Sequence, residues 1–297
     1  LSFVAATPPE LIVLDIRMPG MDGLEVLHRL KAQKESRDIP VIFISVPAEK
    51  TELVEGLKLG GMDFLVKPFR PEELLARVGV HMGLSLLRFQ LEQQLQLFRQ
   101  VLEILTRTDR PNDTIPEIML LIKKSMGFEA VGIRLREGDE IPYCCSDGFS
   151  EDFLCAERYL CERGEEGNIV RDKQGNPALE CMCGNILCGR INPSLPFFTE
   201  GGSFWSNCTT DFLSATTEKD RQGRTRNRCN REGYESVALI PLRSGEDIVG
   251  LLHFADRRKN QFTPESIRFF EGLGASIGIS LNRKSTEEAL LESEERY

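Results

Sequence analysis

Short apolar runs alternate with polar segments over the first quarter of the chain. Three of these runs end in a polar side chain, because LIVLD ends at Asp15, VIFIS at Ser45 and DFLVK at Lys67. Continuous short apolar runs are typical of strands buried on both faces of a parallel sheet. The carboxyl ends of such strands meet at one edge of the sheet, where ligands bind. We therefore expect a carboxylate, a hydroxyl and an ammonium to lie together there.

The next segment predicts a single long helix. No proline occurs between Pro71 and Thr108, and apolar residues recur at spacings of three and four. This seam consists of Leu84, Leu87, Leu91, Leu95, Phe98, Leu102 and Leu105. The spacing favours a helix that packs against another helix. We expect a coiled-coil linker over residues 83–107 that forms a homodimer, and the alternative is an amphipathic helix packed on its own domain.

The remainder of the chain shows both helical and strand patterns, which predicts a domain of helices and strands. An amphipathic helix is expected over residues 114–126, followed by a strand EAVGIRLR and its partner EIPYCCSDGF. Much later, GYESVALIPL and IVGLLHFAD form a second predicted strand pair around a turn. A closing helix begins with Thr263 as N-cap and Pro264 in its first turn, and runs to about Arg296.

Composition narrows the class of protein. The 297 residues, 41% hydrophobic and 28% charged, suffice for about two domains. A net charge of −9 argues against a general binder of nucleic acid or membrane surfaces. No apolar run approaches the ~18 to 20 residues that span a bilayer, and no signal peptide opens the chain, so we expect a cytoplasmic protein. Nine cysteines, an odd number, suggest thiols or metal ligands more than a disulfide framework.

The first region resembles the receiver domain of two-component response regulators. The resemblance rests on Asp15, Ser45 and Lys67 with the following Pro68. It implies a flavodoxin-like, doubly wound parallel sheet of strand order 2-1-3-4-5. It also implies that Asp15 accepts a phosphoryl group from a histidine kinase or phosphotransfer domain, that Ser45 hydrogen-bonds this group, that Lys67 pairs with it, and that the Lys-Pro peptide is cis. Phe64 takes the aromatic switch position of the family, with plain core packing as the alternative.

This sequence also differs from the receiver pattern at its beginning. Family members begin with a strand that ends in two acidic residues, which hold Mg²⁺, and no such strand precedes Leu11. The chain does not start with methionine, so we expect a receiver over residues 1–82 that lacks its N-terminal part. Asp15 is then the one Mg²⁺ carboxylate present, and the given chain should be a poor phosphoacceptor. The apolar edge at Leu11 to Leu14 should be adhesive.

The later region resembles a GAF domain, a sensory module that binds small ligands around a central antiparallel sheet. The resemblance rests on ESVALIPLRSGEDIVGLLHFAD and FTPESIRFFEGLGASIGISLNR. It implies an α+β domain over residues 108–283 with an insert at 155–232 and an unknown small ligand. The ending ALLESEERY, within residues 284–297, is similar to the lead-in of a PAS domain. The chain would then be a piece of a longer sensor, such as a hybrid histidine kinase, although it contains no kinase motifs itself.

The insert is rich in cysteine. Cys181, Cys183 and Cys188 fall within the segment CMCGNILC. Three interpretations stay open: a Zn²⁺ or iron–sulfur site, a redox-responsive set of thiols, and ordinary cysteines in a loop and small core. The spacing matches neither zinc ribbons nor the common ferredoxin runs. A bilin chromophore is disfavoured because His253 lies inside a predicted strand, where it packs, and no suitably placed histidine adjoins a cysteine.

Two further segments of the insert, one rich in arginine and one rich in aromatic residues, each have two possible roles. The arginine-rich segment RQGRTRNRCNR, residues 221–231, either binds an anionic ligand or forms a solvated loop balanced by Glu218, Asp220 and Glu232. The aromatic segment PFFTEGGSFW either walls a ligand pocket or packs the insert onto the sheet. Taken together, these patterns predict a phosphorelay protein in which a receiver is joined by a helix to a GAF domain that senses a ligand, a metal or redox state.

Overall fold

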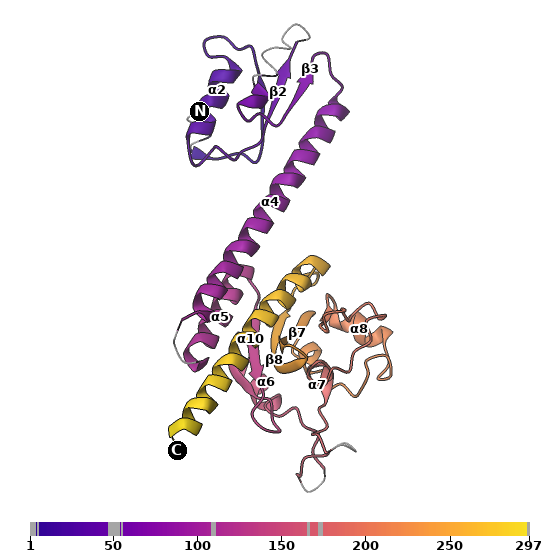
Figure 1. The fold of residues 1–297 in the computed structure, drawn as a ribbon. Coiled ribbons are helices and arrows are strands. Elements are labelled where there is room, and N and C mark those ends of the chain that lie inside the picture. Colours follow the sequence, from indigo (N-terminus) through magenta and orange to yellow (C-terminus); the bar gives the residue numbers. More distant parts are fainter. Residues whose placement is uncertain are drawn as a thin grey trace. The chain divides into compact units, whose positions relative to one another are not determined.

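The structure is a computed structural model and describes residues 4, 6–46, 54, 56–107, 111–164, 167–171 and 175–295. The chain divides into two compact units, Leu1–Gln93 and Gln94–Tyr297 (Figure 1). Each unit has its own sheet and its own core. The helix α4 (Pro71–Leu105) contributes residues to both units.

The first unit is built on three parallel strands in the order β1-β2-β3. These are β1 (Ile12–Asp15), β2 (Val41–Ser45) and β3 (Asp63–Val66), with helix α2 (Gly23–Ala32) following β1. The Asp22 side chain starts α2 by accepting the backbone N–H of Glu25 at 2.8 Å. The buried core of this unit is small and consists of Leu14, Ile16, Leu27, Leu30, Val41 and Phe43. The predicted parallel α/β fold is confirmed.

The second unit has a five-stranded antiparallel sheet in the order β5-β4-β8-β7-β6. Its strands are β4 (Ala130–Leu135), β5 (Tyr143–Asp147), β6 (Phe204–Ser206), β7 (Ser236–Ser244) and β8 (Asp247–Asp256). Its helices are α5 (Pro111–Met126), α6 (Glu151–Ala156), α7 (Cys181–Leu187), α8 (Thr209–Ala215), α9 (Arg228–Arg231) and α10 (Pro264–Glu295). The predicted α+β architecture is confirmed, and the sequence prediction missed the short edge strand β6.

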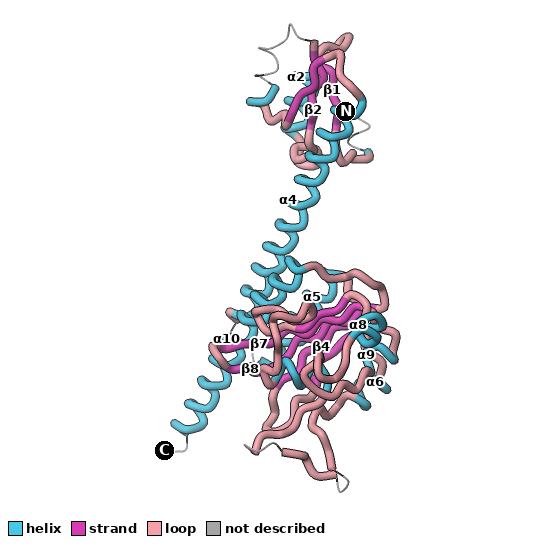
Figure 2. The backbone as a smooth tube through the Cα atoms, turned by 90° about the vertical axis from the view of Figure 1, so that its right-hand side faces the viewer, coloured by secondary structure: helices cyan, strands magenta, loops and turns pink. Residues whose placement is uncertain are grey.

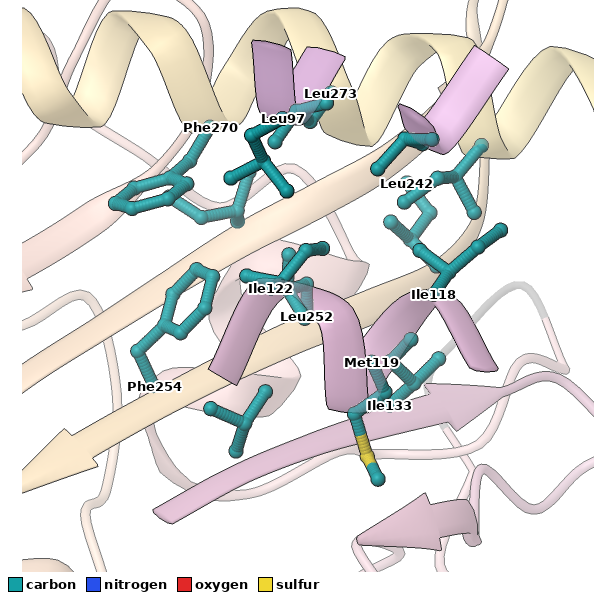
Figure 3. Close-up of a cluster of buried hydrophobic side chains, with 14 of the residues drawn as sticks. Leu97, Ile118, Met119, Ile122, Ile133, Leu242, Leu252, Phe254, Phe270 and Leu273 are labelled. Atoms are coloured by element: carbon teal, nitrogen blue, oxygen red, sulfur yellow. The ribbon is translucent and has the colours of Figure 1, made fainter. Parts of the chain in front are cut away.

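The sheet separates two hydrophobic cores. Helices α4, α5 and α10 cover one face, and the insert with α6 to α9 covers the other (Figure 2). Alternate residues of β7 serve the two sides, since Ala238 and Ile240 belong to the first core and Val237 and Leu239 to the second. Figure 3 shows the first core, where Phe254 and Phe270 pack with ring centroids 4.5 Å apart. Both faces are therefore buried, which explains why β7 and β8 read as nearly unbroken apolar runs.

The two long helices differ in detail from their expected roles. The Leu97, Val101, Ile104 and Leu105 side chains of α4 are buried in the first core of the GAF-like unit. Of the expected linker, residues 83–107, the part from Gln94 onward thus belongs to that unit. The Oγ1 atom of Thr263 accepts the N–H of Ser266 at 3.2 Å, so Thr263 caps α10 as predicted.

Helix α10 continues without interruption to Glu295, through most of the segment read as a PAS lead-in. Arg296 and Tyr297, the end of that segment, lie outside the described residues. In the part of the chain that the structure describes, no helix combines the length and the hydrophobicity that crossing a membrane requires.

Candidate functional site

Asp15 and Lys67 meet at the carboxyl edge of the parallel sheet. Asp15 is the last residue of β1, and Lys67 follows β3 directly. The Lys67 Nζ atom forms an ion pair with Oδ2 of Asp15. The other oxygen, Oδ1, accepts the backbone N–H of Arg17 at 3.2 Å. Both side chains stay partly exposed, so a phosphoryl donor can reach the carboxylate.

The ion pair also sets the charge of the site. The hydrogen bond from Lys67 lowers the pKa of the Asp15 carboxyl below its ordinary value, and the N–H of Arg17 acts in the same direction. Asp15 is therefore fully ionised at neutral pH. An ionised carboxylate is the form that can attack a phosphorus atom.

Ser45 lies beside this pair but does not contact it. Its side chain is buried, and its hydroxyl donates to the backbone oxygen of Val46 at 3.4 Å. The backbone oxygen of Ser45 accepts the N–H of Lys67 at 2.8 Å, which fixes the lysine relative to β2. The Lys67–Pro68 peptide is cis, as the resemblance implies. Phe64 is half-buried and packs against the core of this unit.

The residues around Asp15 do not by themselves fit a magnesium site. Mg²⁺ favours near-octahedral oxygen ligation, usually with more than one carboxylate or phosphate oxygen. Within the described ranges, no three His, Cys, Asp or Glu side chains gather as a metal site requires. The Mg²⁺ prediction for Asp15 therefore stays a prediction, and no step below depends on the ion.

A polar anchor ties α4 to the same sheet. Asp63, the first residue of β3, accepts two hydrogen bonds from Nη1 of Arg77, both at 2.8 Å. Its Oδ2 atom also lies 3.1 Å from Nε2 of His81. The sequence prediction missed this anchor. The signal that could have revealed it is the spacing of Arg77 and His81, four residues apart on one helix face.

The predicted cysteine cluster lies on α7, which packs against β7 and β8. Cys181 is the first residue of the helix, Cys183 is buried within it, and Cys188 follows its last residue and is exposed. Cys181 and Cys183 lie two residues apart, and each shifts the pKa of the other. Cys188 lies at the far end of the helix, so the described residues offer no three-ligand metal group here. The Zn²⁺ or iron–sulfur hypothesis gains no support and stays a prediction.

The two thiols differ in their pKa values. Interaction with the Cys183 thiol lowers the pKa of Cys181 to about 6 despite its burial. The same interaction, together with burial, raises the pKa of Cys183 well above its ordinary value. One sulfur is therefore readily anionic and the other holds its proton.

A small cavity of about 50 Å³ adjoins these thiols. Cys181, Cys183 and Cys229 line it, together with Thr225, Asn227 and Arg228. Apolar residues close its other side, namely Met182, Phe204, Phe212, Leu213, Val237 and Leu239. The cavity lies between α7, the arginine-rich segment and the sheet.

A buried polar chain runs from this cavity into the sheet. The Tyr143 hydroxyl lies 2.8 Å from Nδ1 of His253, and Nε2 of His253 lies 3.8 Å from Sγ of Cys229. Burial lowers the pKa of His253 to about 3, so the ring is neutral. His253 is packed inside β8, as predicted, but its bond to Tyr143 was not foreseen.

The arginine-rich segment is mostly paired with acidic residues of other elements. Arg226 donates to Oε2 of Glu180 at 2.9 Å, and Nε of Arg228 lies 3.4 Å from Oε1 of Glu157. The sequence prediction had assigned the balancing charges to Glu218, Asp220 and Glu232. The actual partners, Glu157 and Glu180, are distant in sequence, which is why the pattern did not reveal them.

The aromatic segment packs the insert onto the sheet. Phe197, Phe198 and Phe204 are buried in the second core, and β6 pairs with β7. Trp205, the one tryptophan, packs against the first core. The packing alternative is confirmed, and of these aromatic side chains Phe204 alone also borders the cavity.

Comparisons with known proteins give two family matches. A response regulator receiver domain model matches residues 1–79, and a GAF domain model matches residues 111–281. The cyclic di-GMP phosphodiesterase response regulator RpfG of Xanthomonas campestris pv. campestris (strain 8004) is 48% identical over 77 residues, which are 26% of this chain and 20% of that protein. The phosphate regulon transcriptional regulatory protein PhoB of Escherichia coli (strain K12) is 41% identical over 70 residues, 24% of this chain and 31% of that protein. The chain thus spans less than a third of the length of either relative.

Solved structures also match parts of this chain. The GAF domain of a phosphoenolpyruvate-protein phosphotransferase from Coxiella burnetii matches 67% of this chain and 98% of its own, at 11% identity and a TM-score of 0.46. NtrX from Brucella abortus matches 31% of this chain and 20% of its own, at 28% identity and a TM-score of 0.29.

Proposed function

Because the chain belongs to the GAF domain family and also carries a response regulator receiver domain, we propose that it acts in phosphorelay signal transduction. Asp15 accepts a phosphoryl group from a histidine kinase or a phosphotransfer domain. The GAF domain receives the resulting change and combines it with its own input. The output differs between the curated relatives, one a phosphodiesterase and one a transcriptional regulator, so no output is assigned to this chain.

The observation that carries the proposal is the Asp15–Lys67 ion pair at the edge of the sheet. Phosphoryl transfer asks a protein mainly for positioning and for charges that stabilise the phosphoryl oxygens. The Asp15 carboxylate attacks the phosphorus atom, and the Lys67 ammonium then neutralises charge on the transferred group. The site therefore has two electrostatic states. In one, Lys67 is paired with the free Asp15 carboxylate, and in the other it is paired with the phosphoryl group.

Helix α4 is the element that transmits this change. Asp63 of β3 holds Arg77 and His81 of α4, and Lys67 follows the same strand. A movement at the end of β3 is therefore passed to the first turns of α4. The last turns of α4 are buried in the core of the GAF unit, so a rotation or shift of the helix repacks that core.

The exposed seam of α4 supports a second part of the proposal, a parallel homodimer. Four seam residues are more than half exposed in the single chain: Leu84, Leu87, Leu91 and Leu95. Exposed leucines at this spacing are stabilised when a second helix covers them. We propose that the covering helix is α4 of a second copy.

The test uses the full-length natural protein and acetyl phosphate as donor. We expect one phosphoryl group by intact mass, no phosphoryl group on Asp15→Asn, and an unchanged yield on Asp38→Asn, an exposed aspartate of the same unit. Trp205 provides a readout of coupling, because it is the one tryptophan and packs in the GAF core. Its fluorescence should change on phosphorylation of the natural protein alone. Equal labelling of Asp15→Asn would refute the phosphoacceptor assignment.

Narrower predictions remain to be tested. A PAS domain or a kinase core in the same protein stays a prediction that the genomic reading frame can decide. Metal binding by Cys181, Cys183 and Cys188 stays a prediction as well. Elemental analysis of the natural protein and of a Cys181→Ser/Cys183→Ser variant decides it, since a genuine site holds stoichiometric zinc or iron that the variant loses.

A further inference from the structure

The cavity beside α7 is lined by three thiols, an unusual concentration in one small space. Cys181 and Cys183 belong to α7, and Cys229 belongs to α9. The cysteines outside this group, such as Cys155 and Cys188, do not border the cavity. The thiol cavity, as we name the space lined by Cys181, Cys183 and Cys229, is therefore a distinct chemical environment.

The backbone places two of these thiols, Cys181 and Cys183, on the same cavity although they are only two residues apart. Residues two apart on a regular helix point to different sides and do not meet. Cys181, however, has φ = 67°, a left-handed conformation that non-glycine residues rarely adopt. With this backbone turn, Cys181 and Cys183 both border the thiol cavity. Such strained residues concentrate at functional sites, where surrounding structure holds them in place.

The size of the thiol cavity limits what can enter it. At about 50 Å³ it is far smaller than the pockets of organic ligands, which measure roughly 300–1,000 Å³. By this measure one water molecule needs roughly 10–15 Å³, so the cavity admits only a few molecules of that size. Hydrogen peroxide exceeds water by one oxygen atom and fits this limit.

The cavity also offers unused polar atoms. Oγ1 of Thr225 and Oδ1 of Asn227 are buried and form no hydrogen bond within the described structure. Both residues line the cavity. Buried polar atoms normally have partners, so these two favour a small guest that carries O–H groups. Hydrogen peroxide donates two such groups.

We propose that Cys181 and Cys183 form a peroxide-sensitive dithiol, with Cys181 as the attacking residue and Cys183 as the resolving residue. The Cys181 sulfur attacks one peroxide oxygen, the O–O bond breaks, and the thiol proton leaves with the departing hydroxide as water. The Cys183 sulfur then displaces hydroxide from the resulting sulfenic acid and forms the disulfide with release of a second water. Two thiols and one peroxide thus give one disulfide and two waters.

The position of the dithiol connects it to the rest of the GAF domain. Helix α7 packs against β7 and β8, and Met182 between the two cysteines is buried in the second core. A disulfide between Cys181 and Cys183 links two residues of the first turn of α7. The oxidised state therefore alters how α7 rests on the sheet, independently of Asp15.

The experiment treats the whole chain with hydrogen peroxide, blocks remaining thiols by alkylation, and maps the cysteines by mass spectrometry. We expect an intramolecular Cys181–Cys183 disulfide before oxidation of Cys144, Cys155 or Cys188. In Cys183→Ser, dimedone should label Cys181 as the trapped sulfenic acid. In Cys181→Ser, the rate of peroxide consumption should fall at least about tenfold, because the activated thiol is gone.

The matched control is Cys188→Ser, which removes an exposed thiol next to the same helix. It should form the Cys181–Cys183 disulfide at the natural rate. Should Cys183→Ser fail to fold by circular dichroism, the map of the natural chain still decides. Free Cys181 and Cys183 after the exposed cysteines have reacted, or a disulfide to Cys229, would overturn the proposal. Asp15→Asn should oxidise normally, so the result is separate from that of the phosphorylation test.

Discussion

Glu157 is a buried carboxylate surrounded by three arginines of the GAF unit. Its Oε1 atom lies 3.4 Å from Nε of Arg228 and 3.8 Å from Nη1 of Arg226, and its Oε2 lies 3.9 Å from Nη2 of Arg134. These three ion pairs are long, and Oε1 of Glu157 accepts no hydrogen bond within the described structure. Burial, and after it the charge of the Cys181 sulfur, raise the pKa of Glu157 to about 7. The cost of burying the charge therefore exceeds the attraction of the arginines.

This balance predicts a pH-dependent stability. The unfolded pKa of 4.5 lies below the folded value of about 7, so the folded chain binds the proton more tightly. The stabilisation is complete below pH 4.5 and is lost as the pH rises to about 7. Relative to Glu157→Gln, the natural chain should lose on the order of 3 kcal/mol across this window. Urea unfolding at several pH values measures the difference, and parallel pH profiles of the two proteins would contradict it.

Some side-chain positions could be predicted from the sequence because local patterns determine them. Asp15 and Lys67 close apolar strands before turn residues, and parallel strands bring their ends together. Glu157 and Arg134 carry no such signal, since one ends a short helix in the insert and the other lies inside a strand. The left-handed Cys181 depends on the tertiary position of α7, so the sequence could predict the presence of the thiols but not that they border one cavity.

Helix α10 lies unusually close to strand β7 because of two glycines. A methyl group on Gly278 would lie 2.3 Å from the backbone oxygen of Arg243, and one on Gly274 would lie 2.8 Å from that of Pro241. Neither backbone atom can yield as a flexible side chain would. The close contact between helix and sheet therefore requires glycine at both positions.

We predict opposite effects for two glycine substitutions on this helix. Gly278→Ala forces α10 away from β7 and should destabilise the GAF unit by about 1 to 3 kcal/mol. Gly272→Ala meets no atom within 4 Å and should leave stability unchanged or raise it by up to about 1 kcal/mol through helix propensity. Thermal and chemical unfolding compare them, and equal stability of the two variants would show that the contact is not tight.

A second pair of substitutions tests the two parts of α4. Leu97 is buried in the GAF core. Leu95, two residues earlier and on a different side of the helix, is exposed. Leu97→Ala should destabilise the GAF unit by about 2 to 5 kcal/mol, because it leaves a cavity. Leu95→Ala removes the same atoms from an exposed site and should change the unfolding free energy little when the protein is dilute. An equal loss of unfolding free energy in both variants would contradict the burial of Leu97 and the exposure of Leu95.

The sequence predicted α4 as one helix but could not predict where its packing changes. Leucine recurs with the same spacing at Leu91, which is exposed, and at Leu105, which is buried. Periodicity records that one face is apolar and does not record what covers it. The buried side chains of the last turns share a core with residues of β4 and β7, two strands that lie about a hundred residues apart in the sequence.

At the scale of the whole molecule, the exposed seam predicts a concentration-dependent dimer. A Leu87→Lys/Leu91→Lys variant places charges on both copies at the proposed contact, and it should be monomeric where the natural chain is dimeric. Sedimentation equilibrium measures the change. The matched control is Arg99→Glu, an exposed charge change on the same helix away from the seam. A natural chain that is monomeric at all concentrations would refute the dimer.

The shared helix has a consequence for how such proteins exchange modules. Signalling proteins diversify by recombining domains, and a crossover succeeds when each half keeps its own core. Here the GAF core includes Leu97, Val101, Ile104 and Leu105, which precede the segment matched by the GAF family model. A crossover at residue 111 would deprive the incoming domain of these side chains. The stretch that tolerates such a joint is the exposed one from Met82 to Leu95, where an insertion leaves the side chains of both cores in place.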